Sequence, residues 1–534
     1  MAGLLACGEN EVRSSTDADA SMSDTLPPMP DGQLEAPGGP PPTCTSGLCA
    51  SDACRDGERT DIARGCRFYA AQLDNVDSDD GKQMMLIMTN ADQTSSANFR
   101  VELHSPDGEW ILAVPQGVVP MKGTARVELS RPLMYSGVAF NGAYRITSDS
   151  PILVTQIISD DAQRDSTSSS GTVLLPAHAL DRHYMALTFS QLAGDTVTAT
   201  PGSRGGAGVI AVVATADGTS VHVTPKVPAL VNDTGILTSG YDALLMSEGD
   251  VLQVFSYLPG GDLSGTTIDS DQPVAVFSGN VFTTYGHVAQ GLSGGDMALE
   301  QMPPLSTWNN EYVGARLSPQ AGCDPFLPAG GAMWQVVAAQ DNTRITVTPS
   351  AGTNVLTNNM SFPMLAQFSL NRGQSSVFMT APDPDWPGSG SPGDIVVVGS
   401  GPLLLAQWLD CDAGLSLGMD TRVGIKTNVT VAFPPGFEQE VLITRRAGTP
   451  VTFDDYPIPD DYFQQIAGYE YQVARLTQGQ FGSCMTDADM GCQHTIKSSL
   501  AGVGVGWRGV DIICSYSLTL PPGDPCVRPM PCVQ

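Results

Sequence analysis

A serine in a glycine-rich pentapeptide is the residue whose surroundings most resemble those of a catalytic nucleophile. Gly291-Leu-Ser293-Gly-Gly295 matches the pattern in which a serine stands on a tight turn between a strand and a helix. Acyl-transfer chemistry also requires a histidine base and an acid within reach of that serine. His287 is only six residues upstream, and no helical periodicity follows the motif. The segment is therefore interpreted as a flexible glycine-rich loop, and no catalytic residue is predicted.

A second glycine motif has the spacing of a dinucleotide-binding loop. Gly504-Val-Gly506-Trp-Arg-Gly509 holds pyrophosphate only when it lies between a strand and the N-terminus of a helix. No helical pattern follows here, because residues 510–514 continue as an apolar strand. The internal repeats described below place these glycines in a turn before that strand. Nucleotide binding is therefore not predicted.

Oxygen-bearing side chains at alternate positions suggest a calcium loop. Asn75, Asp77 and Asp79 follow the spacing of such ligands, but Asp80 and Leu86 stand where an EF-hand requires glycine and glutamate. Two interpretations stay open, a structural calcium ion or turn residues exposed to solvent, and no other cofactor is expected. Further acidic pairs are Asp160 with Asp161, Asp269 with Asp271, Asp410 with Asp412, and Asp487 with Asp489.

The histidines do not form a metal-binding set. His178 and His183 are close in sequence, but no carboxylate at a suitable spacing completes a site. His222 alternates with Val221 and Val223, which predicts the outer face of a strand. Surface or core positions are expected for all six histidines: His104, His178, His183, His222, His287 and His494.

The first cysteine stands in a sequence typical of bacterial lipoproteins. Leu4-Leu5-Ala6-Cys7 resembles a lipobox, which predicts that residues 1–7 are the remnant of a signal peptide and that Cys7 receives lipid. Residues 8–43 follow with seven acidic side chains, one basic side chain and seven prolines, a composition that predicts a disordered tether. Gly8 after the cysteine favours the outer membrane. The alternative is an accidental match at an arbitrary start.

The other eleven cysteines favour an oxidising compartment and disulfide bonds. A zinc site is the rival interpretation, but the cysteines from 44 to 54 are spaced more widely than a C-x2-C knuckle and lack a paired-histidine motif. Because eleven is odd, at least one thiol is unpaired or pairs outside the chain. The candidates are Cys44, Cys49, Cys54, Cys66, Cys323, Cys411, Cys484, Cys492, Cys514, Cys526 and Cys532.

Composition argues against nucleic-acid binding and against a helix that spans a membrane. The 534 residues carry 56 acidic against 26 basic side chains, a formal net charge of -30. Nucleic-acid binding requires clustered lysine and arginine, so it is not predicted. The sequence contains no apolar run of about eighteen residues, so contact with a membrane is expected through the N-terminal lipid alone.

Internal repeats organise the positions described above. Asp92-Gln-Thr94, Asp217-Gly-Thr219 and Asp341-Asn-Thr343 recur at spacings of 125 and 124 residues. Gly123, Gly249 and Gly373 recur at 126 and 124, and Thr449 and Gly479 follow the last copy of each landmark by 106. These spacings predict four copies of one unit, of about 105–130 residues each, over residues 66–532. Residues 44–65 form a Cys-rich segment before them.

Each copy has the pattern of short strands, so the predicted class is all-β. Apolar residues alternate with polar ones, and Asp-Gly or Asp-Asn pairs separate the runs as hairpin turns do. Pro151, Pro273 and Pro402 each precede an apolar run and are expected at the first position of a strand. Two architectures remain open: four tandem β-sandwiches, or one β-propeller in which each copy supplies two blades. The absence of Pro-rich or Ser-rich linkers between copies slightly favours the single closed body.

Several short motifs resemble a known family of extracellular domains. They are Gly65-Cys66-Arg-Phe-Tyr69, Leu263-Ser-Gly-Thr-Thr-Ile268, Asp271-Gln-Pro273-Val-Ala-Val-Phe-Ser-Gly279 and Met302-Pro-Pro-Leu-Ser-Thr-Trp308. Together they resemble the N-terminal domain of IgG Fc-binding proteins, over roughly residues 62–430. The resemblance implies a secreted, non-enzymatic binding or adhesive module with no catalytic residues to transfer.

These observations together predict a lipid-anchored bacterial cell-surface protein that binds an extracellular protein or glycan. Long polar segments recur at one position of the repeat, near 158–174, 280–300 and 409–430. Loops at equivalent positions of a repeat gather on one face, so these segments are the predicted binding face. Two alternatives stay open: a structural envelope protein that contacts its own copies, and an extracellular glycan-active hydrolase.

Overall fold

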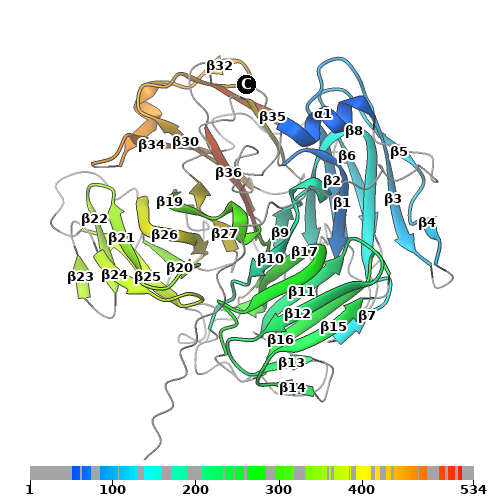
Figure 1. Ribbon diagram of the computed structural model, residues 1–534. Helices are drawn as coiled ribbons and strands as arrows, with labels where there is room; N and C mark the ends of the chain where they lie inside the picture. The colour runs from blue at the N-terminus through cyan, green and yellow to red at the C-terminus, as the bar shows by residue number, and fades with distance from the viewer. Residues whose placement is uncertain are drawn as a thin grey trace, which may run out of the picture. The chain divides into compact units, whose positions relative to one another are not determined.

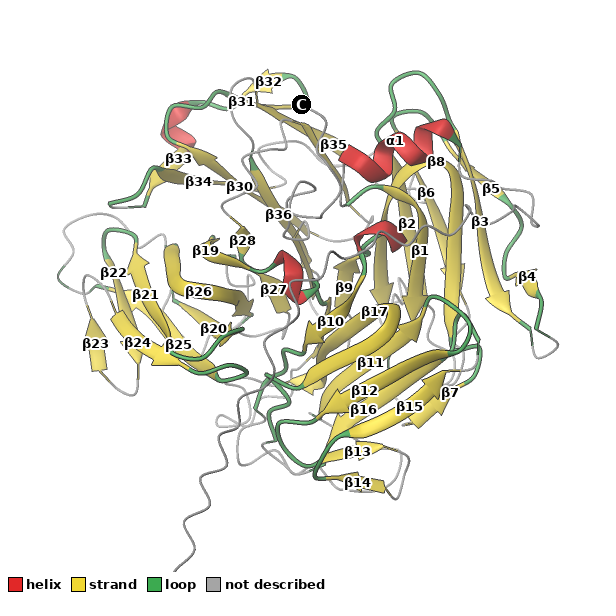
Figure 2. Cartoon of the chain, in the orientation of Figure 1, coloured by secondary structure: helices red, strands yellow, loops and turns green. Residues whose placement is uncertain are grey.

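The computed structural model consists almost entirely of antiparallel strands, which confirms the all-β class predicted from the sequence (Figure 2). The chain divides into residues Met1–Thr45 and Ser46–Gln534, and every residue described here belongs to the second unit. The structure describes residues 51–60, 63–71, 73, 84–105, 108–129, 137–158, 170–190, 207–231, 235–245, 247–257, 261–283, 296–317, 331–357, 360–362, 366–383, 385, 393–409, 415–420, 428–433, 438–466, 468–477, 492–498, 503–510 and 515–519.

Helical structure is limited to short pieces. α1 (Asp52–Thr60) lies in the Cys-rich segment that precedes the predicted repeats. Three single turns of 3-10 helix follow in the described residues: η1 (Ala177–Ala179), η3 (Leu305–Thr307) and η5 (Asp460–Tyr462). Within this part of the chain, no helix has the length and apolar character needed to cross a membrane.

Three long strands organise most of the fold (Figure 1). They are β8 (Ala143–Ile158), β17 (Thr267–Thr283) and β26 (Ile395–Trp408). Each pairs with one set of strands through its first residues and with another set through its last residues. We name the two sets a and b, and we number them by their order in the chain.

The set a strands pair with the start of each long strand, and the set b strands pair with its end. Sheet 1a contains β1 (Gly65–Ala71) and β3 (Ala97–His104), and sheet 1b contains β2 (Met84–Asn90) and β9 (Ser170–Val173). Sheet 2a contains β10 (Asp181–Met185) and β12 (Thr219–Thr224), and sheet 2b contains β11 (Gly208–Ala214) and β18 (Asp296–Gln301). Sheet 3a contains β19 (Asn309–Gly314) and β21 (Thr343–Pro349), and sheet 3b contains β20 (Ala332–Ala338) and β27 (Leu415–Leu417).

Further strands extend these sheets at the side away from the long strand. In sheets 1a and 1b they are β4 (Trp110–Leu112), β5 (Gly117–Val119) and β6 (Gly123–Leu129). In sheets 2a and 2b they are β15 (Tyr241–Leu245), β16 (Val251–Ser256), β13 (Ala229–Val231), β14 (Gly235–Leu237) and β7 (Gly137–Ala139). In sheets 3a and 3b they are β24 (Ala366–Leu370), β25 (Ser375–Pro382), β22 (Thr353–Thr357), β23 (Met360–Phe362) and β28 (Met419–Asp420).

The C-terminal strands repeat this pairing with an interrupted long strand. β35 (Cys492–Ser498) takes the set a partners, and β36 (Gly504–Val510) takes the set b partners. Sheet 4a contains β29 (Asn428–Phe433), β31 (Val451–Phe453) and β32 (Tyr456–Pro457) beside β35. Sheet 4b contains β30 (Glu438–Arg446), β34 (Tyr471–Thr477), β33 (Phe463–Gln465) and β37 (Ser515–Thr519) beside β36.

The landmark prolines lie inside the long strands, so the prediction that they begin a strand was wrong. β8 leaves its set a ladder with β3 at Ser148 and joins its set b ladder at Leu153, and Pro151 lies between these points. β17 and β26 change partners in the same way around Pro273 and Pro402. A proline is tolerated there because the chain passes from one sheet to the next and needs no ladder N–H at that residue.

The Asp-Gly and Asp-Asn pairs form tight turns, but the prediction that they are hairpins was wrong. β11 does not pair with β12, and β20 does not pair with β21, because in each case the two strands follow one another along the same long strand. Gly218 after Asp217 has a φ of 67°, and Asn342 after Asp341 has a φ of 55°. Residues of these types adopt the left-handed region at low cost, which lets the chain turn where it passes from a set b sheet to a set a sheet. The prediction for His222 is confirmed, because it is partly exposed between the buried Val221 and Val223.

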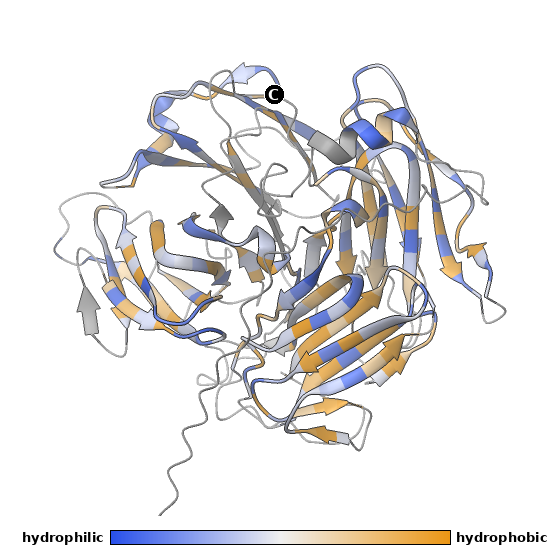
Figure 3. Cartoon of the chain, viewed as in Figure 1, coloured by the Kyte–Doolittle hydropathy of each residue, from blue (hydrophilic) through white to orange (hydrophobic). Residues whose placement is uncertain are grey.

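Buried apolar side chains connect neighbouring sheets, and Figure 3 shows hydrophobic residues running along the strands. One cluster joins sheets 1a and 1b to sheet 2b, for example through Phe99, Leu86 and Phe277. The largest cluster joins sheets 2a, 2b, 3a and 3b. A third joins sheet 3a to sheet 4b, and a fourth joins sheets 4a and 4b to Leu153 and Val173 of sheet 1b.

Candidate functional site

Two short strands, β9 and β18, lie side by side and run in the same direction. The backbone N–H of Leu299 donates to Ser170 Oγ over 2.9 Å, and that of Gln301 donates to Thr172 Oγ1 over 2.9 Å. Residue numbers rise together along the two strands, so the chain enters both from the same edge. β9 also contacts β37, and β27 contacts both β18 and β37.

The segments that precede these strands are the predicted binding loops. Residues 159–169 lead into β9 and residues 284–295 lead into β18, and both segments lie outside the described residues. The described strands nevertheless fix where each segment ends. Because β9 and β18 are parallel neighbours, these two ends lie at one edge. The structure describes residues 415–420 of the third predicted loop, which contain β27.

A buried carboxyl group stands on β18. Thr172 Oγ1 donates to Glu300 Oε2 over 2.7 Å, and both side chains are buried. Glu300 Oε1 has no hydrogen-bond partner within the described part of the chain, and neither does the nearby Gln301 Nε2. Burial raises the pKa of Glu300 well above its usual range, and the hydrogen bond from Thr172 offsets only part of this effect.

The wild-type protein should lose stability as the pH rises toward neutral, because Glu300 has a raised pKa in the folded state. Replacing Glu300 with glutamine should remove this loss. A carboxyl whose pKa is raised on folding contributes fully below its unfolded value of about 4.3, and this contribution is lost as the pH rises toward the folded value. Across that window, Glu300 should lower the free energy of unfolding by about 1.4 kcal/mol per pH unit. Urea unfolding of the wild type and Glu300→Gln from pH 4 to pH 8 measures the difference.

The gap in free energy between the two proteins should widen with pH until Glu300 ionises in the folded state. Glu128→Gln is the control, because the Glu128 side chain is 48% exposed. Parallel pH profiles for wild type and Glu300→Gln would show that Glu300 is already ionised in the folded protein.

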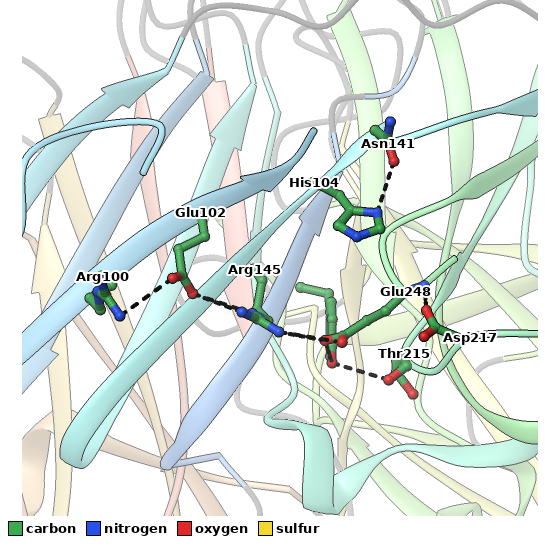
Figure 4. A network of polar contacts seen from close by, with 9 residues as sticks. Arg100, Glu102, His104, Asn141, Arg145, Thr215, Asp217 and Glu248 are labelled. Carbon is green, nitrogen blue, oxygen red and sulfur yellow. Dashed lines mark hydrogen bonds and ion pairs between the residues drawn. The ribbon is translucent and has the colours of Figure 1, made fainter. Parts of the chain in front are cut away.

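A second polar cluster joins sheet 1a to sheet 2b (Figure 4). Arg145 of β8 donates to Glu102 Oε2 of β3 over 3.1 Å, and its other terminal nitrogen lies 3.3 Å from Glu248 Oε2. Arg100 lies 3.6 Å from the second oxygen of Glu102. Glu248 belongs to the turn before β16, and its backbone N–H donates to Asp217 over 2.8 Å. The cluster therefore adds side-chain contacts to the backbone hydrogen bond of 3.0 Å that the Ala143 N–H donates to the carbonyl of Gly249.

Aromatic side chains complete this cluster. Tyr69 donates to Glu248 over 2.6 Å, and burial together with the negative charge of Glu248 raises the pKa of Tyr69 above its usual range. The Arg145 guanidinium stacks on Trp110 at 3.8 Å, and His104 packs against the same ring while it contacts Asn141 Oδ1 over 3.0 Å. A guanidinium engaged by two carboxylates and a ring is typical of a structural joint.

One of the family-like motifs, Leu263-Ser-Gly-Thr-Thr-Ile268, also lies at a joint between sheets. Leu263 is fully buried, and Ser264 Oγ donates to the carbonyl of Thr188 over 2.7 Å while accepting from Gln335 Nε2 of sheet 3b over 3.0 Å. Gly265 has a φ of 88°, and a Cβ atom there would lie 1.9 Å from the carbonyl oxygen of Gly373. A motif glycine and a repeat-landmark glycine thus meet backbone to backbone between sheets 2a and 3b.

One predicted disulfide is present in the structure. Cys54 of α1 is bonded to Cys66 of β1. Cys492 begins β35. The predicted lipidation site, Cys7, lies outside the described residues. So do the remaining disulfide candidates: Cys44, Cys49, Cys323, Cys411, Cys484, Cys514, Cys526 and Cys532.

The calcium prediction stays open, because Asn75, Asp77 and Asp79 lie outside the described residues. Within the described ranges, no group of three or more histidine, cysteine, aspartate or glutamate side chains is placed to hold a metal ion. Histidines in this part of the chain instead form single contacts with an acid. The pairs are His183 with Asp269, His222 with Asp242, and His494 with Asp454.

The two glycine motifs have different outcomes. Gly291-Leu-Ser293-Gly-Gly295 lies outside the described residues. The predicted turn at Gly504, Gly506 and Gly509 was wrong, because these glycines lie inside strand β36. The backbone of β36 pairs with β30 on one side and β37 on the other. Its N–H groups are therefore engaged in ladders and are not arranged as a phosphate-binding loop.

Sequence reasoning missed Arg145 and Glu300 as positions of interest. Both stand within strands, where an isolated charge in a sequence is usually exposed. Their partners lie far away along the chain: Glu248 is 103 residues from Arg145, and Thr172 is 128 residues from Glu300. The available signal was the 124–126-residue repeat, which aligns the turn of Glu248 with Gly123 and Gly373 but does not reveal what that turn contacts.

Comparisons with known proteins give one informative match. No curated protein matches the chain significantly. A GH78-family rhamnosidase of Bacillus sp. GL1 matches with 9% identity and a TM-score of 0.11, which is too low to carry an argument. That match covers 70% of this chain and 55% of the length of the rhamnosidase.

The informative match is to the family described as IgGFc binding protein. It covers residues 170–505, more than half of the chain, from the start of β9 into β36. The expected range of 62–430 shares residues 170–430 with this match and stops before sheet 4b. We conclude that the chain belongs to the IgGFc binding protein family.

Proposed function

We propose that the protein is a non-enzymatic binding module of the bacterial cell surface that recognises an extracellular protein or glycan. The family match over residues 170–505 is the observation that carries this proposal. It supports a binding role and a protein ligand, and extracellular location is the general expectation for the family.

We further propose that four copies close into one propeller-like body. Each a sheet and each b sheet has a core of four strands, and the fourth group keeps the pairing scheme although its long strand is interrupted. The apolar clusters connect the sheets in the order 1b, 1a, 2b, 2a, 3b, 3a, 4b and 4a, and sheet 4a packs against sheet 1b again. A closed cycle leaves no end sheet without a neighbour, which supports a single body over four separate sandwiches.

The proposed binding face is formed by the segments before β9, β18 and β27. The parallel arrangement of β9 and β18 supports this proposal, because it brings the ends of residues 159–169 and 284–295 to one edge. Loops held on a rigid framework are common sites of recognition. Attachment through a lipid on Cys7 and the acidic segment 8–43 is part of the proposal and rests on the sequence alone.

The test is a binding screen with a loop-replaced variant. Full-length protein carrying Cys7→Ser, to prevent lipidation, is screened against arrays of glycans and surface proteins with and without calcium. Replacing residues 284–295 with a Gly-Ser linker of equal length should weaken the strongest binding at least tenfold, or about 1.4 kcal/mol. Surface plasmon resonance measures the change.

The control replaces residues 232–234, between β13 and β14, with Gly-Ser-Gly. In sheet 2b, β14 lies at one end and β18 lies beside β17 at the other, so this variant alters the same sheet far from the proposed face. Equal weakening in both variants would contradict the proposed face. A failure to bind any array component, together with concentration-dependent self-assembly on a sizing column, would favour a structural envelope protein.

A further inference from the structure

One segment of sheets 4a and 4b contains the triplet Asp-Asp-Tyr twice within eleven residues. Residues 453–463 read Phe-Asp-Asp-Tyr-Pro-Ile-Pro-Asp-Asp-Tyr-Phe. Three buried apolar side chains, Phe453, Ile458 and Phe463, recur at intervals of five and belong to one hydrophobic cluster. Between them stand two Asp-Asp-Tyr triplets, at 454–456 and 460–462, which we call the paired triplets.

The two tyrosines of the paired triplets are directed to solvent. Tyr456 is 77% exposed, the largest exposure of a large hydrophobic side chain in the described residues, and Tyr462 is 39% exposed. A tyrosine with an exposed ring presents apolar area at a low cost in conformational entropy, which is why tyrosine is enriched at protein-binding hot spots. Neither tyrosine ring belongs to the hydrophobic cluster that contains Phe453, Ile458 and Phe463.

The backbone of the segment is held in a fixed shape. Asp454 and Asp455 have φ angles of 50° and 68° in the turn between β31 and β32. The backbone N–H of Ile458 donates to the carbonyl of Val451 over 2.9 Å, and residues 460–462 form the 3-10 turn η5. Pro457 and Pro459 restrict the chain between the triplets. A surface already held in shape loses little entropy when it binds.

Basic side chains of the neighbouring strand β35 fix both acids of the first triplet. His494 Nδ1 lies 2.6 Å from Asp454 Oδ2, and Lys497 Nζ lies 2.6 Å from Asp455 Oδ1. Burial opposes ionisation of Asp454, but hydrogen bonds from His494 and the Thr495 N–H outweigh it and hold the pKa of Asp454 below its usual range.

The second triplet is fixed from the interior by Arg445. Its side chain is 1% exposed, donates to Asp460 Oδ1 over 2.7 Å and stacks on the ring of Phe463 at 3.5 Å. Arg445 also donates to the carbonyl of Thr449 over 2.8 Å. Asp460 therefore stays in place while its carboxylate remains largely accessible, with 85% of the side chain exposed.

We propose that the paired triplets form a second binding surface for a lysine- and arginine-rich segment of a partner protein. The four aspartates lie on a chain with a net charge of -30, so the surface attracts cations and disfavours nucleic acid and anionic lipid. Ammonium and guanidinium groups pair with the exposed carboxylates and stack on the tyrosine rings. This surface uses residues of sheets 4a and 4b and is independent of the loops before β9 and β18.

The first experiment removes the rings while keeping every charge. Fluorescence anisotropy measures binding of a labelled decapeptide of alternating arginine and glycine to full-length Cys7→Ser protein in 150 mM salt. The double variant Tyr456→Ser with Tyr462→Ser should bind at least tenfold more weakly than the parent. Tyr257→Ser is the matched control, because Tyr257 is 45% exposed elsewhere on the protein. Equal losses in both proteins, or no binding by the parent, would overturn the proposal.

The second experiment separates local charge from total charge. Asp455→Asn with Asp461→Asn should also weaken binding at least tenfold. The control pair Asp242→Asn with Asp269→Asn removes the same two charges from exposed aspartates that contact His222 and His183. It should leave binding within twofold, and equal weakening would mean that the peptide senses net charge alone. The variant with residues 284–295 replaced should bind this peptide normally, so a failure of the loop proposal is distinguishable from a failure of this one.

Discussion

Replacing Gly265 with alanine is expected to lower the free energy of unfolding by about 3–5 kcal/mol, which for many domains abolishes folding. Two effects add. Gly265 has a φ of 88°, which L-residues adopt only at a cost, and a Cβ atom there would lie 1.9 Å from the carbonyl oxygen of Gly373. The opposing atoms are backbone and cannot rotate away, so sheets 2a and 3b must separate. Urea unfolding of the purified variant measures the loss.

Gly218→Ala is the matched control for this prediction. Gly218 also has a positive φ, of 67°, but a Cβ atom there would have no other atom within 4 Å. Its substitution should cost about 1–2 kcal/mol from backbone strain alone. The difference between the two variants isolates the contact between sheets, and equal losses would show that the sheets accommodate the extra methyl group.

Replacing Arg145 with methionine is expected to cost about 3–5 kcal/mol, because the substitution leaves two carboxylates without their shared cation. The side chains of Glu102 and Glu248 are only 5% and 16% exposed. Methionine retains much of the contact with Trp110, so the loss of stability reports mainly on the missing positive charge of Arg145. Thermal and urea unfolding at pH 7 check the magnitude.

Arg446→Met provides the control for Arg145. Arg446 pairs with Glu470 over 3.1 Å, but the two side chains are 49% and 56% exposed, so its loss should cost less than about 1 kcal/mol. Adding Glu102→Gln to Arg145→Met should recover part of the stability, because it removes one of the two buried carboxylates that Arg145 no longer neutralises. No recovery in the double variant would contradict the proposed role of uncompensated charge.

Local features of the fold could be predicted from the sequence because they depend on neighbouring residues. The alternation around His222 and the turn at Asp217-Gly218 follow from side-chain periodicity and backbone preferences, and both are present. Pro273 was misplaced for a physical reason. A proline that precedes an apolar run fits the start of a strand as well as a bend where a continuous strand changes partners. Only the pairing of β17 with both β12 and β11 distinguishes these cases.

The joints between sheets could not be predicted, because they depend on which distant residues meet. Nothing in the local sequence pairs Arg145 with Glu248, or Glu300 with Thr172. The family-like motifs were recognised as a signature, yet the reason for the glycine in Leu263-Ser-Gly-Thr-Thr-Ile268 appears only when Gly373 is placed beside it. The exposed rings of Tyr456 and Tyr462 also depend on which neighbours are buried.

The disulfide between Cys54 and Cys66 determines how a mechanical load on the N-terminal part of the chain reaches the sheets. A pulling force that arrives at α1 passes through the sulfur atoms to β1, so residues 55–65 bear none of the tension. β1 is paired with β8 along most of its length, and Ser51 adds a hydrogen bond of 2.7 Å to the carbonyl of Asp149. The load is thus shared among several bonds of a long strand that spans two sheets.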